Sequence, residues 1–134
     1  MDYRTGNDLD LDSVIDLYRA STLGARRPLD DRARMRAMLA NANLVVTAWD
    51  GDLLVGISRA LSDFAYVIYL SDLAVRESHQ RRGIGRALIR RTQAAAPAAQ
   101  LVLLSAPGAV DYYPHIGFTP HPSAWVLRPG KSIH

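Results

Sequence analysis

One stretch of the sequence has the residue types and the spacing of an anion-binding site. Residues 80–87 follow a β-rich run at 65–75, and two glycines, Gly83 and Gly85, stand where a helix is expected to begin. The first turn of a helix has unpaired backbone N–H groups and a partial positive charge, and glycines leave a phosphate free to reach that backbone. Three arginines add positive charge around the same point: Arg81, Arg82 and Arg86. The pattern therefore predicts a site for a phosphate group.

The same stretch departs from two other nucleotide-binding motifs. The dinucleotide-binding fingerprint needs a third glycine at the position of Leu88, and no Gly-Lys-Ser or Gly-Lys-Thr of a P-loop occurs in the chain. A glycine-containing helix start with solvated arginines is the simpler alternative for residues 80–87.

The composition excludes several classes of chemistry. The chain has no cysteine, which excludes disulfides, thiolate nucleophiles and cysteine-ligated metal centres. No Gly-x-Ser-x-Gly elbow is present to supply a serine nucleophile, and the histidines lack metal-ligand spacing. All 16 basic residues except Lys131 are arginine, whose planar donors suit phosphate and carboxylate groups, and the net charge is +3. We therefore expect an anionic ligand and no metal.

Length and hydropathy fit one globular domain over residues 1–134. The 49% hydrophobic and 22% charged residues are close to average usage, and compact domains most often have ~100–150 residues. The first residues lack the basic and apolar regions of a signal peptide. The uncharged stretch at 94–110 is interrupted by Pro97 and Pro107, which argues against a membrane span. The protein is expected to be soluble and cytoplasmic.

The spacing of apolar residues predicts the elements that position residues 80–87. Helices are expected from about Asp10, Asp30 and Gly83, the last with Ile84, Ala87, Leu88 and Ala95 on its apolar face. Strands are expected at 3–6, 44–49, 53–61, 65–75, 101–104 and 124–127, with an Asp50-Gly51 hairpin turn and 101–104 buried. A short helix is expected at 109–116, ended by Gly117. This order favours a mixed sheet with helices on both faces over a doubly wound sheet.

Two signatures give the sequence a resemblance to the GNAT superfamily of acyl-CoA-dependent N-acetyltransferases. The first is Gln-Arg-Arg-Gly-Ile-Gly at 80–85, and the second is Tyr-Pro-His-Ile-Gly-Phe at 113–118, about 30 residues later. The apolar run 101–104 lies between them, where the family has its fifth strand. The resemblance implies an α/β (α+β mixed) fold: a central, mostly antiparallel mixed sheet with helices on both faces and splayed fourth and fifth strands.

The resemblance also implies acetyl-CoA as cosubstrate. Its pantetheine arm would lie between the splayed strands and pair with the backbone of Leu73, Ala74 and Val75. The pyrophosphate would lie on the residues that open the next helix: Gln80, Arg81, Arg82, Gly83, Ile84, Gly85, Arg86 and Ala87. Many relatives carry an asparagine after the fifth strand that contacts the cofactor. Here Ser105 follows that strand, and two alternatives are open: its hydroxyl takes over the contact, or this cofactor contact is missing.

The family's usual mechanism is direct attack of the amine on the thioester. Tyr113 matches the family's tyrosine and would protonate the leaving thiolate, since a phenol of pKa about 10 can protonate a thiolate whose acid has a pKa of about 8.5. Tyr112 is the competing candidate. A backbone N–H near Leu73 would bind the oxyanion. Asp72 is the first candidate for the base, with a turn or cap role, a water relay and His115 as alternatives.

The acceptor is less well specified by the sequence. In the family the first two helices and their loop form much of the acceptor site, which corresponds here to residues 21–43. This segment contains five arginines and only two aspartates. That balance argues against a polycation, and we expect a small primary amine, with a protein N-terminus or lysine as alternatives. A non-catalytic acyl-CoA-binding domain and a basic nucleic-acid-binding module remain as other functions. Relatives are often dimers, so a homodimer is expected.

Overall fold

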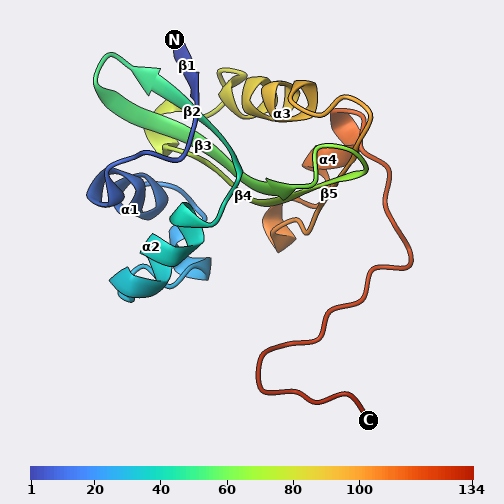
Figure 1. Cartoon of the computed structure of the whole chain (residues 1–134). Coiled ribbons are helices and arrows are strands. Elements are labelled where there is room, and N and C mark those ends of the chain that lie inside the picture. Colours follow the sequence, from blue (N-terminus) through green and yellow to red (C-terminus); the bar gives the residue numbers. More distant parts are fainter. The chain divides into compact units, whose positions relative to one another are not determined.

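The computed structural model describes residues 1–134 (Figure 1). The chain forms two units, Met1–Leu104 and Ser105–His134, and each is described by itself.

The first unit is built on a five-stranded sheet whose strands follow the chain order. The strands are β1 (Asp2–Thr5), β2 (Leu44–Asp50), β3 (Leu53–Ser62), β4 (Val67–Val75) and β5 (Gln100–Leu103). Neighbouring strands from β1 to β4 pair antiparallel, and β5 pairs parallel to β4. The predicted mixed, mostly antiparallel sheet is therefore confirmed. The predicted hairpin is also present, with its turn at Gly51-Asp52, one residue later than the expected Asp50-Gly51.

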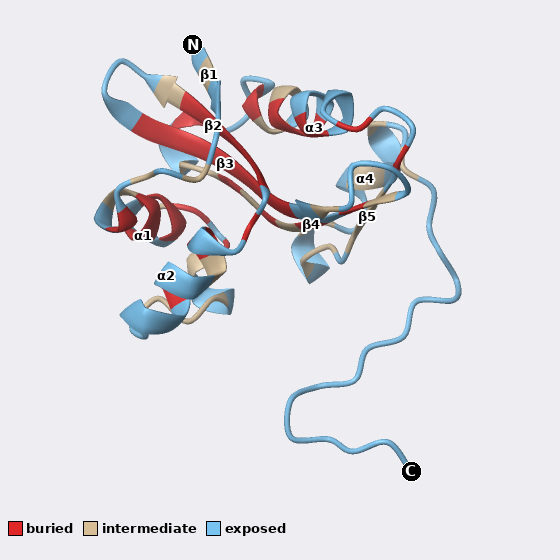
Figure 2. Cartoon of the chain, viewed as in Figure 1, coloured by how far each residue is buried: buried red, intermediate tan, exposed pale blue.

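Helices cover both faces of this sheet, as expected. Figure 1 shows α1 (Leu11–Arg19) and α2 (Arg32–Ala40) on one face and α3 (Ile84–Ala94) on the other. Figure 2 shows buried residues along β2 and β3 and on the sheet-facing sides of α1 and α3, with the outward sides exposed. No helix has both the length and the apolar character needed to span a bilayer.

The starts of the three long helices differ in a way that the sequence explains. Asp10 caps α1 by accepting a hydrogen bond from the Ser13 backbone, and Asp31 caps α2 through the Arg34 backbone, both at 3.1 Å. The cap of α2 thus lies one residue after the Asp30 start expected from the sequence. Helix α3 begins at Gly83 as predicted, but no side chain caps it. Its N–H groups are therefore left without an internal carboxylate partner.

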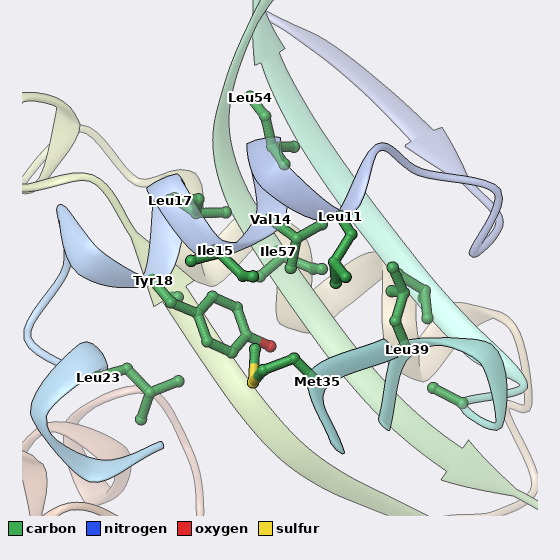
Figure 3. Packing of buried hydrophobic residues seen from close by; sticks show 13 residues of the cluster. Leu11, Val14, Ile15, Leu17, Tyr18, Leu23, Met35, Leu39, Leu54 and Ile57 are labelled. Carbon is green, nitrogen blue, oxygen red and sulfur yellow. The ribbon is translucent and has the colours of Figure 1, made fainter. Parts of the chain in front are cut away.

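Two hydrophobic clusters hold the helices on the sheet. Figure 3 shows side chains of α1 and α2 gathered over Ile57 of β3. On the opposite face, α3 packs its buried Ile84 and Leu88 against strand β3 at Gly56. A Cβ at Gly56 would lie 3.0 Å from Cδ1 of Leu88 and 3.2 Å from Cγ2 of Ile84. The missing side chain at Gly56 therefore lets α3 approach the sheet closely.

Two details of burial in this unit differ from the sequence-based expectations. The run 101–104 is not a buried strand: Gln100 is exposed, Leu101–Leu103 are half-buried and Leu104 is 53% exposed. The reason is its position at the sheet edge, where β5 pairs with β4 alone. Ala95 lies after the end of α3 and is exposed, whereas its neighbour Ala96 is buried.

The second unit contains a 3-10 turn, η3 (Pro107–Ala109), and the short helix α4 (Tyr112–His115). They replace the single helix expected at 109–116, and Gly117 follows with a positive φ of 107°, as expected of a residue that ends a helix. The strand expected at 124–127 is absent, and Trp125 is 92% exposed. The aromatic and β-branched residues there have no strand partner, and without one a high β-propensity does not make a strand.

Candidate functional site

Strand β4 has an open edge over its second half. Its pairing with β5 ends at Leu70, which lies opposite Leu103. The next residue, Ser71, is an extra residue in the ladder with β3, because Ala60 pairs with Leu70 while Arg59 pairs with Asp72. Such a bulge bends and twists a strand locally. The two strands therefore part at Ser71, which confirms the expected divergence of the fourth and fifth strands.

The ladder between β3 and β4 determines which backbone groups face this open edge. The Arg76 N–H donates to the Val55 carbonyl at 2.9 Å, and alternate residues of an antiparallel strand bond to the same neighbour. Asp72 and Ala74 therefore turn their backbone toward β3, whereas Leu73 and Val75 turn theirs to the open edge. The Gln80 side chain donates to the Val75 carbonyl at 3.0 Å. The N–H groups of Leu73 and Val75 and the Leu73 carbonyl remain for a ligand.

The chain then forms a concave turn into α3. Arg81 and Gly83 both have left-handed backbone conformations, with φ of 65° and 80°. Left-handed residues in a turn can point successive N–H groups inward and so make an anion-binding concavity. A Cβ at Gly83 would meet nothing within 4 Å. Glycine is therefore needed there because of the positive φ, and not because a side chain would lack space.

The first turn of α3 adds free donors to this concavity. Its first internal hydrogen bond runs from the Ala87 N–H to the Gly83 carbonyl at 3.0 Å, so the N–H groups of Ile84, Gly85 and Arg86 have no helical partner. No acidic residue occupies this turn. Arg81, Arg82 and Arg86 are exposed and form no ion pair. The residues predicted to bind a phosphate therefore come together at one uncapped, positively charged helix start.

His79 stabilises the turn that leads into this helix. Its imidazole is buried, with Nε2 2.9 Å from Oδ2 of Asp50 and Nδ1 2.7 Å from the Ser78 hydroxyl. The hydrogen bond with His79 lowers the pKa of Asp50 below its ordinary value. His79 thereby ties the turn to the end of β2. The structure contains no group of three His, Asp or Glu residues that could hold a metal ion.

Asp72 lies in a buried ion cluster. Its Oδ2 accepts hydrogen bonds from Nε of Arg59 at 2.5 Å and from the Tyr18 hydroxyl at 2.6 Å, and its Oδ1 accepts one from Nε of Arg27 at 2.7 Å. The Asp72 side chain is 0% exposed. Burial alone would raise its pKa, but the hydrogen bond and charge of Arg59 outweigh burial and hold the pKa below its ordinary value. A carboxylate in this state is a weak proton acceptor.

The cluster holds one positive charge more than it holds negative charge. Burial and the charge of Asp72 raise the pKa of Tyr18 well above 10, so this phenol stays neutral. Two guanidinium groups, those of Arg27 and Arg59, therefore face one carboxylate. Sequence reasoning missed Tyr18, Arg27 and Arg59. The one available signal was Arg59, the single charged residue of its strand, because a buried arginine needs a buried partner.

Tyr113 lies in the second unit, and its motif explains its setting. Its carbonyl accepts a hydrogen bond from the Phe118 N–H at 2.9 Å. The Tyr113 and Phe118 rings pack edge to face, with their centroids 5.3 Å apart. Gly117 supplies the positive φ that turns the chain back. Pro114 lies within the first turn of α4, where its missing N–H costs no helical bond, and Tyr113 stays helical. Burial, with a smaller contribution from Tyr112, raises the Tyr113 pKa.

The remaining candidates in the second unit have less defined surroundings. Ser105 is half-buried and its hydroxyl forms no hydrogen bond within the protein, while Tyr112 and His115 are exposed. The basic nucleic-acid-binding alternative rests on the arginines of residues 26–36 and 76–91. Of these, Arg32, Arg34 and Arg36 lie in α2 and Arg86, Arg90 and Arg91 lie in α3, and the two helices cover opposite faces of the sheet (Figure 1). They therefore form no continuous basic patch.

Comparisons with known proteins agree on one family. A family model described as "Acetyltransferase (GNAT) domain" matches residues 21–129. A solved acetyltransferase of the GNAT family from Streptococcus pneumoniae TIGR4 has a TM-score of 0.73 and 26% identity, covering 95% of this chain and 98% of that one. The aminoglycoside N-acetyltransferase AAC(6')-Iy, solved in complex with CoA, shares the fold with a TM-score of 0.73 at 19% identity, covering 97% and 95% of the two chains.

A curated relative extends the comparison to plants. The probable acetyltransferase TAP2 from Glycine max is 28% identical over 135 residues, which cover 90% of this chain and 52% of that protein. The chain thus spans about half the length of this relative. The family model covers well over half of the chain, and the structural match agrees with it. The chain therefore belongs to the GNAT acetyltransferase family.

Proposed function

We propose that this protein is an acetyl-CoA-dependent N-acetyltransferase that moves an acetyl group directly onto a small primary amine. The observation that carries the proposal is the uncapped start of α3 beside the open edge of β4. This arrangement offers backbone donors to a pyrophosphate and, next to it, strand donors to an amide-containing arm. A structural neighbour solved with CoA bound supports a CoA-type cosubstrate.

Each proposed cofactor contact uses a group that the protein leaves free. Leu73 and Val75 would pair with the pantetheine arm through their backbone, and Ala74 between them keeps the strand on β3. Residues 80–87 would form the pyrophosphate site, in which the free N–H groups of Ile84, Gly85 and Arg86 bind the phosphates and Arg81, Arg82 and Arg86 add charge. Gln80 and Ala87, which donate hydrogen bonds to the Val75 and Gly83 carbonyls, would fix the shape of this site. Ser105 would offer its hydroxyl. The family model matches residues of both units, so we propose that residues 1–134 act as one N-acetyltransferase domain.

The proposed transfer needs one proton donor, one acceptor and an oxyanion partner. The amine nitrogen attacks the thioester carbonyl, the C–S bond breaks, the sulfur gains a proton and the nitrogen loses one. The Leu73 N–H would bind the oxyanion. The raised pKa of Tyr113 keeps its phenol protonated and supports it as the donor to sulfur. The buried Asp72 is fully engaged by Arg59, Arg27 and Tyr18, so we propose that water, and not Asp72, takes the proton from nitrogen.

A calorimetric titration with acetyl-CoA tests the cofactor site. We expect saturable binding to the wild type and loss of binding in Gly85→Glu, which places bulk and negative charge at the start of α3. Ala94→Glu adds the same charge at the far end of the same helix and should bind normally. No binding by the wild type, or equal binding by both variants, would contradict the proposed site.

A thiol-reactive dye tests the transfer itself, because a protein without cysteine gives no background. We expect CoA release that depends on an added amine, in a panel that includes small amines and lysine-containing peptides. Binding of acetyl-CoA without release in any mixture would favour a non-catalytic acyl-CoA-binding domain. Release with peptides alone would identify a protein acetyltransferase.

A further inference from the structure

Arg27 is held rigidly but has spare hydrogen-bonding capacity. It comes from the connection between α1 and α2, and its guanidinium donates from Nε to Asp72, from Nη2 to the Ser71 carbonyl at 2.9 Å and from Nη1 to the Arg26 carbonyl at 2.9 Å. A guanidinium has five N–H donors, so two remain. The Arg27 side chain is 21% exposed. It is therefore a preorganised cation that can still reach a ligand.

Arg27 also lines a surface hollow that contains more positive than negative charge. The residues around this hollow are Arg19, Gly24, Ala25, Arg27, Leu29 and Asp30. Its one carboxylate, Asp30, is fully exposed and lies 4.0 Å from the exposed Arg19 guanidinium, a distance at which water screens the pair strongly. Behind the hollow, Arg59 and Arg27 share the single carboxylate of Asp72. A ligand in this hollow would therefore meet an excess of positive charge.

The hollow lies close to the proposed reaction centre. Arg27 holds the carbonyl of Ser71, the bulge residue at which β4 leaves β5. Leu73, whose N–H would bind the oxyanion, is two residues further along, a distance of about 7 Å in a strand. An acceptor whose amine and anionic group are a few bonds apart is thus the right size to meet both.

Resting on the proposed function, we propose that the acceptor is an amine that also carries a carboxylate, and that Arg27 is the residue that selects it. The carboxylate would accept charge-assisted hydrogen bonds from the spare Arg27 donors, with Arg19 adding charge at the rim. Polyamines would be disfavoured by the same excess of positive charge.

The test compares amino acids with their own carboxamides and with a polyamine, through CoA release. Rates are compared at equal concentrations of neutral amine, because amidation also changes the pKa of the amine. We expect kcat/KM to be about tenfold or more higher for the carboxylate form, the value of one charge-assisted hydrogen bond. Equal rates for the two forms, or a preference for the carboxamide or the polyamine, would overturn the proposal.

Variants in the same segment assign the preference to Arg27. Arg27→Gln should raise KM for the amino acid and remove the preference while KM for acetyl-CoA stays unchanged, and Arg27→Lys should restore part of it. Arg26→Gln removes the same charge from the neighbouring exposed side chain and is the matched control. Arg19→Gln, outside the buried cluster, should reduce the preference even if Arg27→Gln fails to fold. A full preference retained in Arg19→Gln and Arg27→Lys would overturn the assignment.

The outcomes separate this proposal from the proposed function. Turnover of carboxamides or polyamines alone leaves the N-acetyltransferase in place and overturns the carboxylate preference. If acetyl-CoA binds but no amine reacts, titrating an amino acid and its carboxamide into the protein saturated with CoA decides the point. Selective binding of the amino acid, lost in Arg19→Gln, supports the acceptor site, and equal binding of both compounds overturns it.

Discussion

The hydroxyl of Tyr18 donates a 2.6 Å hydrogen bond to Asp72, a residue 54 positions further along the chain. This hydrogen bond joins α1 to β4. Arg59 of β3 donates to the same Asp72 carboxylate, so β3 is tied to the same point. Arg27 completes the cluster from the connection between α1 and α2. A single carboxylate therefore fixes three elements and one loop around the point where β4 and β5 diverge.

Replacing this carboxylate should destabilise the protein strongly. Asp72→Asn leaves two buried or half-buried guanidinium groups without a counter-charge, and we expect the free energy of unfolding to fall by about 3–5 kcal/mol. Urea unfolding followed by circular dichroism measures this change. Asp12→Asn is the matched control, because Asp12 pairs with Arg32 on the surface, with side chains 73% and 52% exposed, and should cost less than about 1 kcal/mol. Equal losses for the two variants would show that the cluster does not stabilise the fold.

The same carboxylate should make stability depend on acid pH. The folded-state pKa of Asp72 lies below the unfolded value of about 3.9, so its contribution is complete above that value and is lost as pH falls through the folded value. Backbone hydrogen bonds from Tyr66, Val67 and Ala65 lower the pKa of Asp63 to about 2, so Asp63 acts in the same direction. Urea unfolding from pH 6 to pH 2 should show a steep loss below about pH 4 that is weaker in Asp72→Asn. An unchanged slope in that variant would contradict this assignment.

Local pattern was enough to predict α1 and the start of α3, where the proposed phosphate site lies. The period of apolar residues placed α1 behind Asp10, and Gly83 with Gly85 placed the start of α3. These features depend on neighbours within a few positions in the chain, which is what periodicity and capping report.

The cluster around Asp72 was beyond such reasoning. Asp72 lies within β4, three residues before its end, and its sequence neighbours do not distinguish a structural carboxylate from a base. Its partners Arg27 and Tyr18 lie 45 and 54 positions away. The same limit applies to residues 124–127, where a strand-forming composition has no strand beside it. A local pattern contains no information about a distant partner, so neither the partners of Asp72 nor the lack of a strand partner at 124–127 could be predicted.

Gly83 should be required for the shape of the turn before α3. Its φ of 80° is strained for any side chain, while a Cβ would meet nothing within 4 Å. We expect Gly83→Ala to cost about 1–2 kcal/mol of stability and to weaken acetyl-CoA binding, because relief of the strain moves the N–H groups. Urea unfolding and calorimetry measure the two effects. Gly108→Ala, also in open space but without a positive φ, is the control and should change stability by less than about 1 kcal/mol.

Tyr112 and Tyr113 offer a matched pair for the proposed proton donor. Both are in α4, with ring centroids 5.3 Å apart, and it is the Tyr113 ring that packs edge to face on Phe118. Burial raises the pKa of Tyr113. Phenylalanine at either position keeps the ring and removes the hydroxyl, so the comparison measures the effect of each hydroxyl group on the reaction.

Tyr113→Phe should therefore lower kcat and leave KM for both substrates nearly unchanged. A general acid contributes about 10²–10⁴-fold, and a thiolate is a good leaving group, so we expect a loss near the lower end of that range. Because the raised pKa keeps the Tyr113 phenol protonated, wild-type kcat should show no decline from loss of this proton up to about pH 10. Tyr112→Phe should retain full activity. Unchanged kcat in Tyr113→Phe would remove Tyr113 as the acid, and a loss confined to Tyr112→Phe would transfer the role to Tyr112.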